Sequence, residues 1–175
     1  MNALIFLIDT LAGLYLMVLL LRLLLQQVRA DFRNPLARGI VQLSNPLILP
    51  LRRVLPAARQ VDSASVVAVL AVLAAKVLVL FALAGMGLPE PLLFLRTLAV
   101  ELARLLLQTY FYLIVVYALL SFLTPGTYSP AQSLLASLCE PVLRRIRRRI
   151  PALSGLDLSP LWATIGIQAL LLLLR

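Results

Sequence analysis

The residues of this sequence that could do chemistry are charged side chains set in, or beside, long apolar runs. Arginines gather in two stretches of the chain, at Arg52, Arg53, Arg144, Arg145, Arg147, Arg148 and Arg149. Guanidinium groups near a membrane surface bind anionic lipid headgroups or an acidic partner, and they also hold a loop on the cytoplasmic side. The pattern predicts a lipid- or partner-binding surface, and fixing the topology alone is the alternative.

Two more charges lie inside apolar runs, where an ionisable residue is a functional candidate. Arg22 stands five residues before Gln27, so reaching the interface or pairing with a polar neighbour is favoured. Lys76 lies near the middle of its run, where a lysine costs about 2.5–3.5 kcal/mol to insert. It therefore needs a partner, such as Asp9, Glu101 or backbone carbonyls. Structural pairing and substrate contact both stay open for Lys76.

Side chains for catalysis or metal binding are scarce. The chain has no histidine and one cysteine, Cys139, which we interpret as a small apolar residue at a membrane surface. Catalytic triads, metal-ligand clusters, paired carboxylates and glycine-rich phosphate loops are not recognisable. We therefore expect no enzymatic activity, no cofactor and no metal.

The elements that position these residues are apolar segments. Of the 175 residues 62% are hydrophobic, the mean hydropathy is +1.02 and the formal net charge is +9. Four segments approach the roughly 17–25 residues that cross a bilayer, at about 3–27, 64–84, 98–123 and 158–174. Spanning segments that satisfy their own backbone are helices. The fold class predicted is an all-α integral membrane protein with four transmembrane helices, the fourth at the lower limit of length.

Charge placement predicts the orientation. The stretches 29–62 and 124–157 carry most of the arginines, so both should face the cytoplasm. The short connection 85–95 and both termini then face outward. No positive charge precedes the first apolar run, so we expect it to stay as an anchor rather than be cleaved. The predicted location is the bacterial inner (plasma) membrane, as a multi-pass protein.

The two basic stretches are copies of each other. A shift of 95 positions aligns their prolines, arginines and aspartates without a gap. We therefore predict two tandem repeats, 1–90 and 91–175, each with two spans. The motif positions are Asn34, Pro35, Asn45, Pro46, Pro50, Pro56 and Asp62 in the first copy, and Ser129, Pro130, Glu140, Pro141, Pro151, Asp157, Ser159 and Pro160 in the second.

Each basic stretch is expected to hold a short amphipathic helix. Asn34-Pro35 and Ser129-Pro130 supply an N-cap and a first-turn proline. Pro46 and Pro141 should end these helices. Beyond Pro141, Val142, Ile146 and Ile150 alternate with arginines, a pattern typical of a helix lying in the membrane interface.

The aspartates of the two copies, Asp62 and Asp157, precede the second and fourth spans. We expect each to cap its helix. Binding to loop arginines across the axis that relates the repeats is the alternative.

These motifs resemble those of the YggT family, also called YlmG. The likeness rests on Arg22, Asn34-Pro35, Asn45-Pro46-Leu47, Pro50, Arg52-Arg53 and Leu55-Pro56, and on their counterparts through Leu156-Asp157-Leu158-Ser159-Pro160. Tyr117 departs from the pattern, since it stands where the first copy has Arg22. So does the first copy's Asp62-Ser63-Ala64-Ser65. The resemblance implies four spans, a non-enzymatic role, and links to osmotic and potassium balance, to cell division, and in plastids to cytochrome assembly.

The function expected is that of a membrane scaffold or assembly factor. Its expected partners are the lipid bilayer, anionic phospholipid and an unidentified membrane protein or further copies of the chain, with no nucleic acid. The alternative is a small oligomeric transporter or channel in potassium or osmotic balance.

Overall fold

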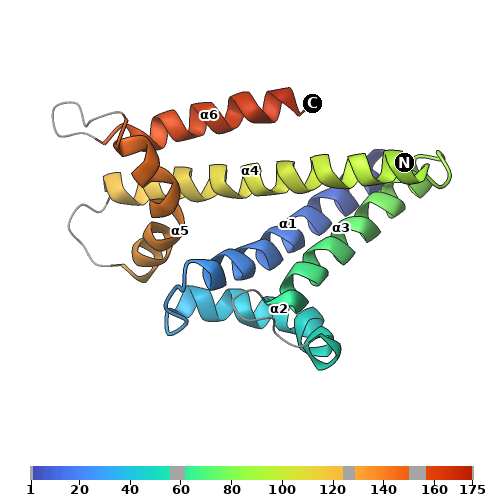
Figure 1. Ribbon diagram of the computed structural model, residues 1–175, viewed down its shortest axis with the longest axis horizontal. Helices are drawn as coiled ribbons and strands as arrows, with labels where there is room; N and C mark the ends of the chain where they lie inside the picture. Colours follow the sequence, from blue (N-terminus) through green and yellow to red (C-terminus); the bar gives the residue numbers. More distant parts are fainter. Residues whose placement is uncertain (1, 56–61, 124–128, 150–156, 175) are drawn as a thin grey trace. The chain divides into compact units, whose positions relative to one another are not determined.

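The computed structural model of the protein describes residues 2–55, 62–123, 129–149 and 157–174. Within those ranges the chain forms six helices and no strand (Figure 1). Their bounds are α1 Asn2–Gln27, α2 Pro35–Val54, α3 Ser63–Leu83, α4 Pro91–Leu123, α5 Pro130–Arg147 and α6 Ser159–Leu173. The all-helical prediction is confirmed.

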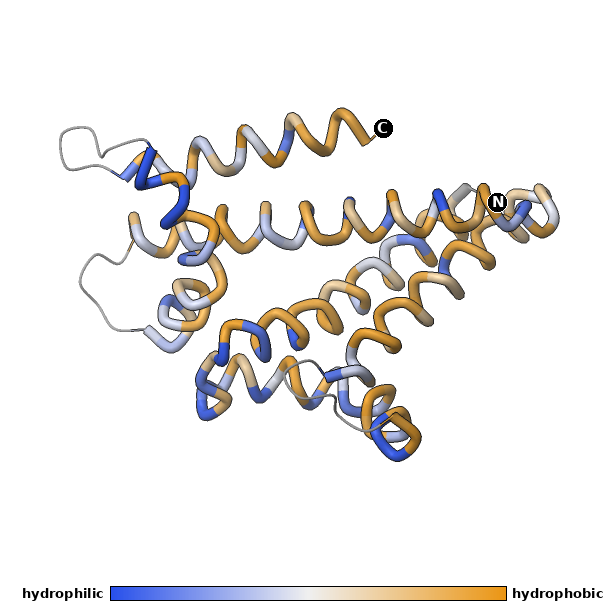
Figure 2. Tube along the Cα trace, viewed as in Figure 1, coloured by the Kyte–Doolittle hydropathy of each residue, from blue (hydrophilic) through white to orange (hydrophobic). Residues whose placement is uncertain are grey.

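Three helices, α1, α3 and α4, are long and apolar enough to cross a membrane, and Figure 2 shows them dominated by hydrophobic residues. α4 has 33 residues and begins at Pro91, earlier than the start predicted near Leu98. α6 is apolar but has 15 described residues, about 22 Å of helix against a hydrocarbon core of about 30 Å. The chain therefore has the character of a membrane protein, and the fourth span stays a prediction.

The prediction that Pro46 and Pro141 end the amphipathic helices is wrong. α2 continues through Pro46 and Pro50 to Val54, and α5 continues through Pro141 to Arg147. A proline inside a helix removes one backbone donor and displaces the preceding turn. The helix bends instead of ending, and Figure 1 shows α2 changing direction in its second half.

Two compact units make up the chain. The first contains residues 1–27 and 40–105, and the second contains residues 28–39 and 106–175. In the first unit α1 and α3 pack side by side in opposite directions (Figure 1). Their contact buries Leu16 and Leu19 of α1 with Leu73 and Val77 of α3. This pair is the frame that holds the charged residues of the first unit.

In the second unit α5 packs against α6. Leu134, Leu138 and Leu143 of α5 and Ile167 of α6 are buried there. The segment 28–39 belongs to this unit, and the Asn34 side-chain amide donates to the Pro130 carbonyl at 2.6 Å. The division of the sequence at residue 90 into two repeats stays a prediction.

Candidate functional site

The first polar cluster lies where the end of α2 meets the start of α3. The Arg52 guanidinium donates to Asp62 Oδ2 from Nη2 at 2.5 Å and from Nε at 3.2 Å. The same oxygen accepts the Ser65 hydroxyl at 2.7 Å and the Gln26 amide at 3.3 Å. Asp62 is buried, with 8% of its surface exposed. One carboxylate thus joins α1, α2 and α3.

The charge of Asp62 is stabilised where it lies. Burial alone would raise the pKa of this carboxyl, but hydrogen bonds from Arg52, Ser65 and Gln26 outweigh burial and lower its pKa to about 2. Asp62 occupies the N-cap position of α3, yet its side chain makes no capping hydrogen bond. The capping role predicted for Asp62 is therefore wrong, since its carboxylate binds side chains.

The second polar cluster has the same core. Arg147 donates to Asp157 Oδ2 at 2.8 Å, and its Nη1 donates to Glu140 Oε2 at 2.9 Å. Tyr117 of α4 also hydrogen-bonds Arg147. Asp157 Oδ1 accepts the Ser159 backbone amide at 2.9 Å, so Asp157 does serve the first turn of α6. Burial disfavours both charges, yet their hydrogen bonds lower the pKa of Asp157 and raise that of Arg147.

The two ion pairs are equivalent in sequence. Arg52 and Asp62 align with Arg147 and Asp157 at the 95-residue shift. Each arginine binds the aspartate of its own copy, so the alternative of binding across the repeat axis is wrong for these pairs. In both copies the pair ties the end of the amphipathic helix to the start of the next apolar helix.

The surroundings of the two pairs differ in charge. Arg22, 2% exposed, donates from Nη1 to Ser44 Oγ and Asn45 Oδ1, both at 2.8 Å, and to the Val41 carbonyl at 3.3 Å. Pairing with polar neighbours, expected from the sequence, is thus confirmed for Arg22. At the equivalent positions the second copy has Tyr117 for Arg22 and Glu140 for Asn45.

Both replacements make the cluster of the second copy more negative. Two arginines and one carboxylate form the first cluster, whereas one arginine and two carboxylates form the second. The residues that sequence reasoning missed are neutral: Gln26, Ser44 and Ser65. Gln26 follows Arg22 by four residues, and Ser65 follows Asp62 by three, so helical spacing was the signal available for these two.

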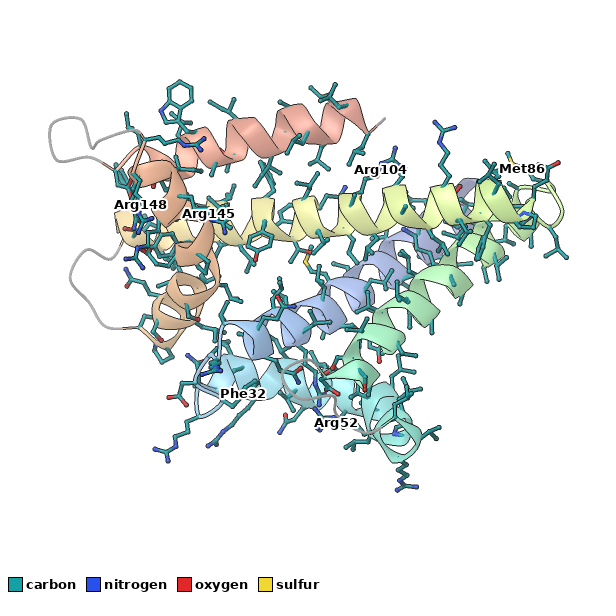
Figure 3. The ribbon with its side chains drawn as sticks, viewed as in Figure 1. Phe32, Arg52, Met86, Arg104, Arg145 and Arg148 are labelled. Carbon is teal, nitrogen blue, oxygen red and sulfur yellow. The ribbon has the colours of Figure 1, made fainter. Side chains whose placement is uncertain are left out.

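Five other arginines of the two basic stretches lie on the protein surface. Arg53, Arg144, Arg145, Arg148 and Arg149 are exposed, and none forms an ion pair within the part of the chain that the structure describes. Figure 3 shows Arg145 and Arg148 together at the C-terminal end of α5. The exposed arginines are thus distinct from Arg52 and Arg147, which hold aspartates.

The structure also shows where the predicted capping residues and the other motif positions lie. Asn34 caps α2, because its Oδ1 accepts the Leu36 amide at 2.9 Å, whereas Ser129 stands at the N-cap of α5 without a side-chain cap. Ser159 and Pro160 open α6. Pro56 and Pro151 lie outside the described residues.

Lys76 has the partners expected from the sequence. Its Nζ lies 2.7 Å from Asp9 Oδ1 and 3.2 Å from Glu101 Oε2. Glu101 also pairs with Arg104 at 2.9 Å, three residues along α4. Two acids and two bases thus form a neutral network that joins α1, α3 and the first part of α4.

Cys139 is fully buried, and burial raises the pKa of its thiol to about 12. Such a thiol stays protonated and unreactive at neutral pH. Across the described ranges, no three His, Cys, Asp or Glu side chains gather where they could hold a metal ion.

Comparison with known proteins places the chain in a family. The CCB3/YggT family model matches residues 1–83 and 97–175. The uncharacterized protein YggT of Escherichia coli strain K12 is 38% identical over 161 residues, covering 92% of this chain and 83% of its own. A protein of Vibrio alginolyticus, described only as uncharacterized and in the proC 3′ region, is 43% identical, covering 96% of this chain and 91% of its own. No solved structure matches. The chain belongs to the CCB3/YggT family.

Proposed function

We propose that this protein is a non-enzymatic scaffold or assembly factor of the bacterial inner membrane. It contacts anionic phospholipid, and through it or beside it a membrane protein partner, with the exposed arginines of its cytoplasmic stretches. It has four spans, and both termini lie on the outer side. By family resemblance the process served is cell division or envelope and osmotic homeostasis.

The division of the arginines into two groups carries this proposal. Arg52 binds the buried Asp62, Arg147 binds the exposed Asp157, and these ion pairs fix the ends of α2 and α5. Arg144, Arg145, Arg148 and Arg149 extend from the end of α5 and are exposed. Each cation near an anionic leaflet contributes about 1 kcal/mol to attraction. The paired arginines fix the helix ends, and the exposed arginines beside them present positive charge. Such a surface is suited to binding an anionic surface.

The apolar face of α2 supports the same role. Ala37, Ser44 and Ile48 are buried against the protein, whereas Leu43 and Val54 on a neighbouring face are 62% and 78% exposed. The exposed Arg53 lies on a further face of the same helix. A helix with one face on the protein, one apolar face open and one cationic face fits the headgroup boundary of a bilayer.

Two matched double variants test the role of the exposed arginines. Arg53→Gln with Arg148→Gln removes one exposed charge from each copy, and Arg52→Gln with Arg147→Gln removes the paired charge next to it. Native mass spectrometry of the detergent-solubilised protein, titrated with phosphatidylglycerol, measures lipid affinity. We expect the first variant to lose up to about 2 kcal/mol of affinity.

The second double variant should lose stability and keep most of its lipid affinity, since its charges face aspartates. The loss in the first variant should shrink as salt rises, because exposed charges are screened beyond about 10 Å at 0.1 M. Unchanged phosphatidylglycerol affinity in the first variant, with unchanged partner capture from crosslinked membranes, would mean that these arginines set topology alone.

A transporter or channel is the second candidate, and the Asp9–Lys76–Glu101–Arg104 network inside the apolar helices is the observation that favours it. Each charge there has a partner of opposite sign, which is also what structural pairing needs. Purified protein in liposomes decides between them. The scaffold should pass no potassium, whereas saturable flux that is lost on Lys76→Leu would establish the transporter.

A further inference from the structure

A pocket of about 520 Å³ lies at the end of the α1–α3 pair opposite the Arg52–Asp62 cluster. The first turns of α1 supply Ile5, Phe6 and Asp9, and the end of α3 with the residues after it supplies Leu80, Phe81, Ala84 and Met86. Figure 3 labels Met86 at this end of the molecule. Six of the seven lining residues are apolar, and the seventh is a carboxylate.

The lining suits a cation with apolar substituents. Two phenylalanines, whose ring faces attract cations, line the pocket, and Met86 adds a polarisable sulfur. Asp9 supplies the single negative charge, and half of its side chain is exposed. An apolar pocket with one convergent polar group is the usual form of a small-molecule site. A hydrated inorganic ion would gain little from such walls.

Asp9 can accept a second cation at low cost. It shares Lys76 with Glu101, so a ligand that engages the Asp9 carboxylate leaves Lys76 with a counter-ion at 3.2 Å. The Lys76 side chain is 10% exposed and Glu101 23%, so Asp9 is the accessible member of the three. Breaking a pair within a low-dielectric region is costly only when a charge is left alone.

We propose that this pocket binds a hydrophobic organic cation, such as a quaternary ammonium or phosphonium compound, with the cationic centre at Asp9 and the apolar groups against Phe6 and Phe81. The pocket shares no residue with the exposed arginines, and the proposal does not depend on the scaffold role. The probe that tests it is tetraphenylphosphonium. Its binding to the full chain in phosphatidylcholine nanodiscs is measured by equilibrium dialysis, with binding to empty nanodiscs subtracted.

Saturable binding is expected for the unchanged chain. Asp9→Asn should weaken it about tenfold or more, because a charge-assisted contact is lost. Phe81→Leu should weaken it about threefold through the lost ring face. Glu90→Gln, a change at an exposed carboxylate outside the pocket, is the matched control and should leave binding unchanged.

Two further variants separate the site from the stability of the fold. Asp9→Glu keeps the charge and should keep the binding, whereas Ala84→Trp fills the pocket without touching the ion pairs and should abolish it. Binding that survives both Asp9→Asn and Ala84→Trp overturns the proposal. So does equal binding of triphenylphosphine oxide, a neutral analogue, which would mark the pocket as a site for lipid chains.

Discussion

Comparing equivalent positions of the two copies shows which residues of the polar clusters occur in both and which occur in one only. The shared element is an arginine ten residues before an aspartate, as Arg52–Asp62 and Arg147–Asp157. The specific elements are Arg22 with Asn45 in one copy and Tyr117 with Glu140 in the other. The Arg–Asp pair lies at the end of each basic stretch. The residues that differ leave the first cluster with an excess of positive charge and the second with an excess of negative charge.

Removing the shared pair should destabilise the first copy more than the second. Arg52→Gln leaves Asp62, 8% exposed, without its charged partner, and we expect a loss of about 1–3 kcal/mol in the free energy of unfolding. Arg147→Gln affects side chains that are about two-fifths exposed, where an ion pair contributes less than about 1 kcal/mol. Unfolding in mixed micelles with rising SDS measures both losses.

Arg53→Gln is the neighbouring control for this measurement. Arg53 is exposed and has no ion pair among the described residues, so its variant should stay within about 0.5 kcal/mol of the unchanged chain. Equal stability for Arg52→Gln and Arg53→Gln would contradict a structural role of the Arg52–Asp62 pair.

Acid should weaken the first cluster in a defined pH window. The pKa of Asp62 is about 2 in the folded protein and 3.8 ordinarily, so the folded state favours the ionised form. Its contribution is complete above about pH 5 and is lost as the pH falls from about 4 to about 2. The upper limit is about 2 kcal/mol, at about 1.4 kcal/mol for each pKa unit.

Comparison with Asp62→Asn isolates this contribution, since other carboxylates titrate in the same range. Thermal unfolding in detergent between pH 2 and pH 5 should show a smaller pH dependence for the variant. If both proteins lose stability in parallel as the pH falls, the pKa of Asp62 is not lowered by its partners.

How far the site could be predicted depended on the kind of residue. Partners for Lys76 were predictable, because a buried charge in lipid needs a counter-charge and Asp9 and Glu101 are among the few acids of the chain. Which arginine binds which aspartate was not predictable. That choice depends on the bend of α2 and on the distance between two helix ends. Neither can be inferred from the types of the residues.

At the scale of elements, α2 has one side buried against the protein and one apolar side that is exposed. Its buried face and its exposed apolar face lie next to each other on the helix surface, so periodicity alone cannot assign them. The structure leaves Leu43 exposed, while the adjacent Ser44 is buried and bound to Arg22. The exposed apolar face of α2 is therefore the one that we expect to contact lipid.

Spin labels on α2 test this orientation. In a Cys139→Ala background, labels at Leu43→Cys and Val54→Cys should collide more with oxygen than with a water-soluble nickel chelate, because they enter the acyl region. A label at Gln42→Cys, one residue away and also exposed, is the control and should show the reverse. Equal chelate accessibility at Leu43 and Gln42 would place α2 in water rather than in the interface.

The prolines show why element ends were harder to predict than element types. Pro46, Pro50 and Pro141 lie inside helices, although a proline lowers helix stability by about 3 kcal/mol in isolation. Packing of Ile48 in α2 and of Leu143 in α5, both fully buried, holds each helix beyond its proline. Local propensity was thus overcome by tertiary contacts that the sequence does not display.

At the scale of the molecule, the chain combines a repeated framework with charges that are not repeated. Lys76 has no counterpart in the second copy, since the position equivalent to Lys76 is Leu171. The two ion pairs that close the basic stretches occur in both copies. The Arg–Asp pair is thus common to the two basic stretches, whereas the charge at Lys76 is not.

The number of spans is the prediction that decides the topology of the molecule. α6 is the short member, with 15 described residues, yet Leu170, Leu172 and Leu173 keep its C-terminal half apolar and exposed. A helix of this length can cross if the bilayer thins locally or if flanking residues reach the interface. The arginines of α5 predict that the stretch before α6 lies on the cytoplasmic side, and we therefore expect the C-terminus on the outer side.

Reporter fusions along the full chain test this topology directly. Alkaline phosphatase fused after Glu90 and after Arg175 should be active, since both positions are expected outside. Green fluorescent protein fused within 33–53 or 144–149 should fluoresce, as it does in the cytoplasm. An inactive phosphatase at Arg175 with an active one at Glu90 would leave three spans, place α6 on the cytoplasmic surface beside α5, and end the equivalence of the two copies as membrane elements.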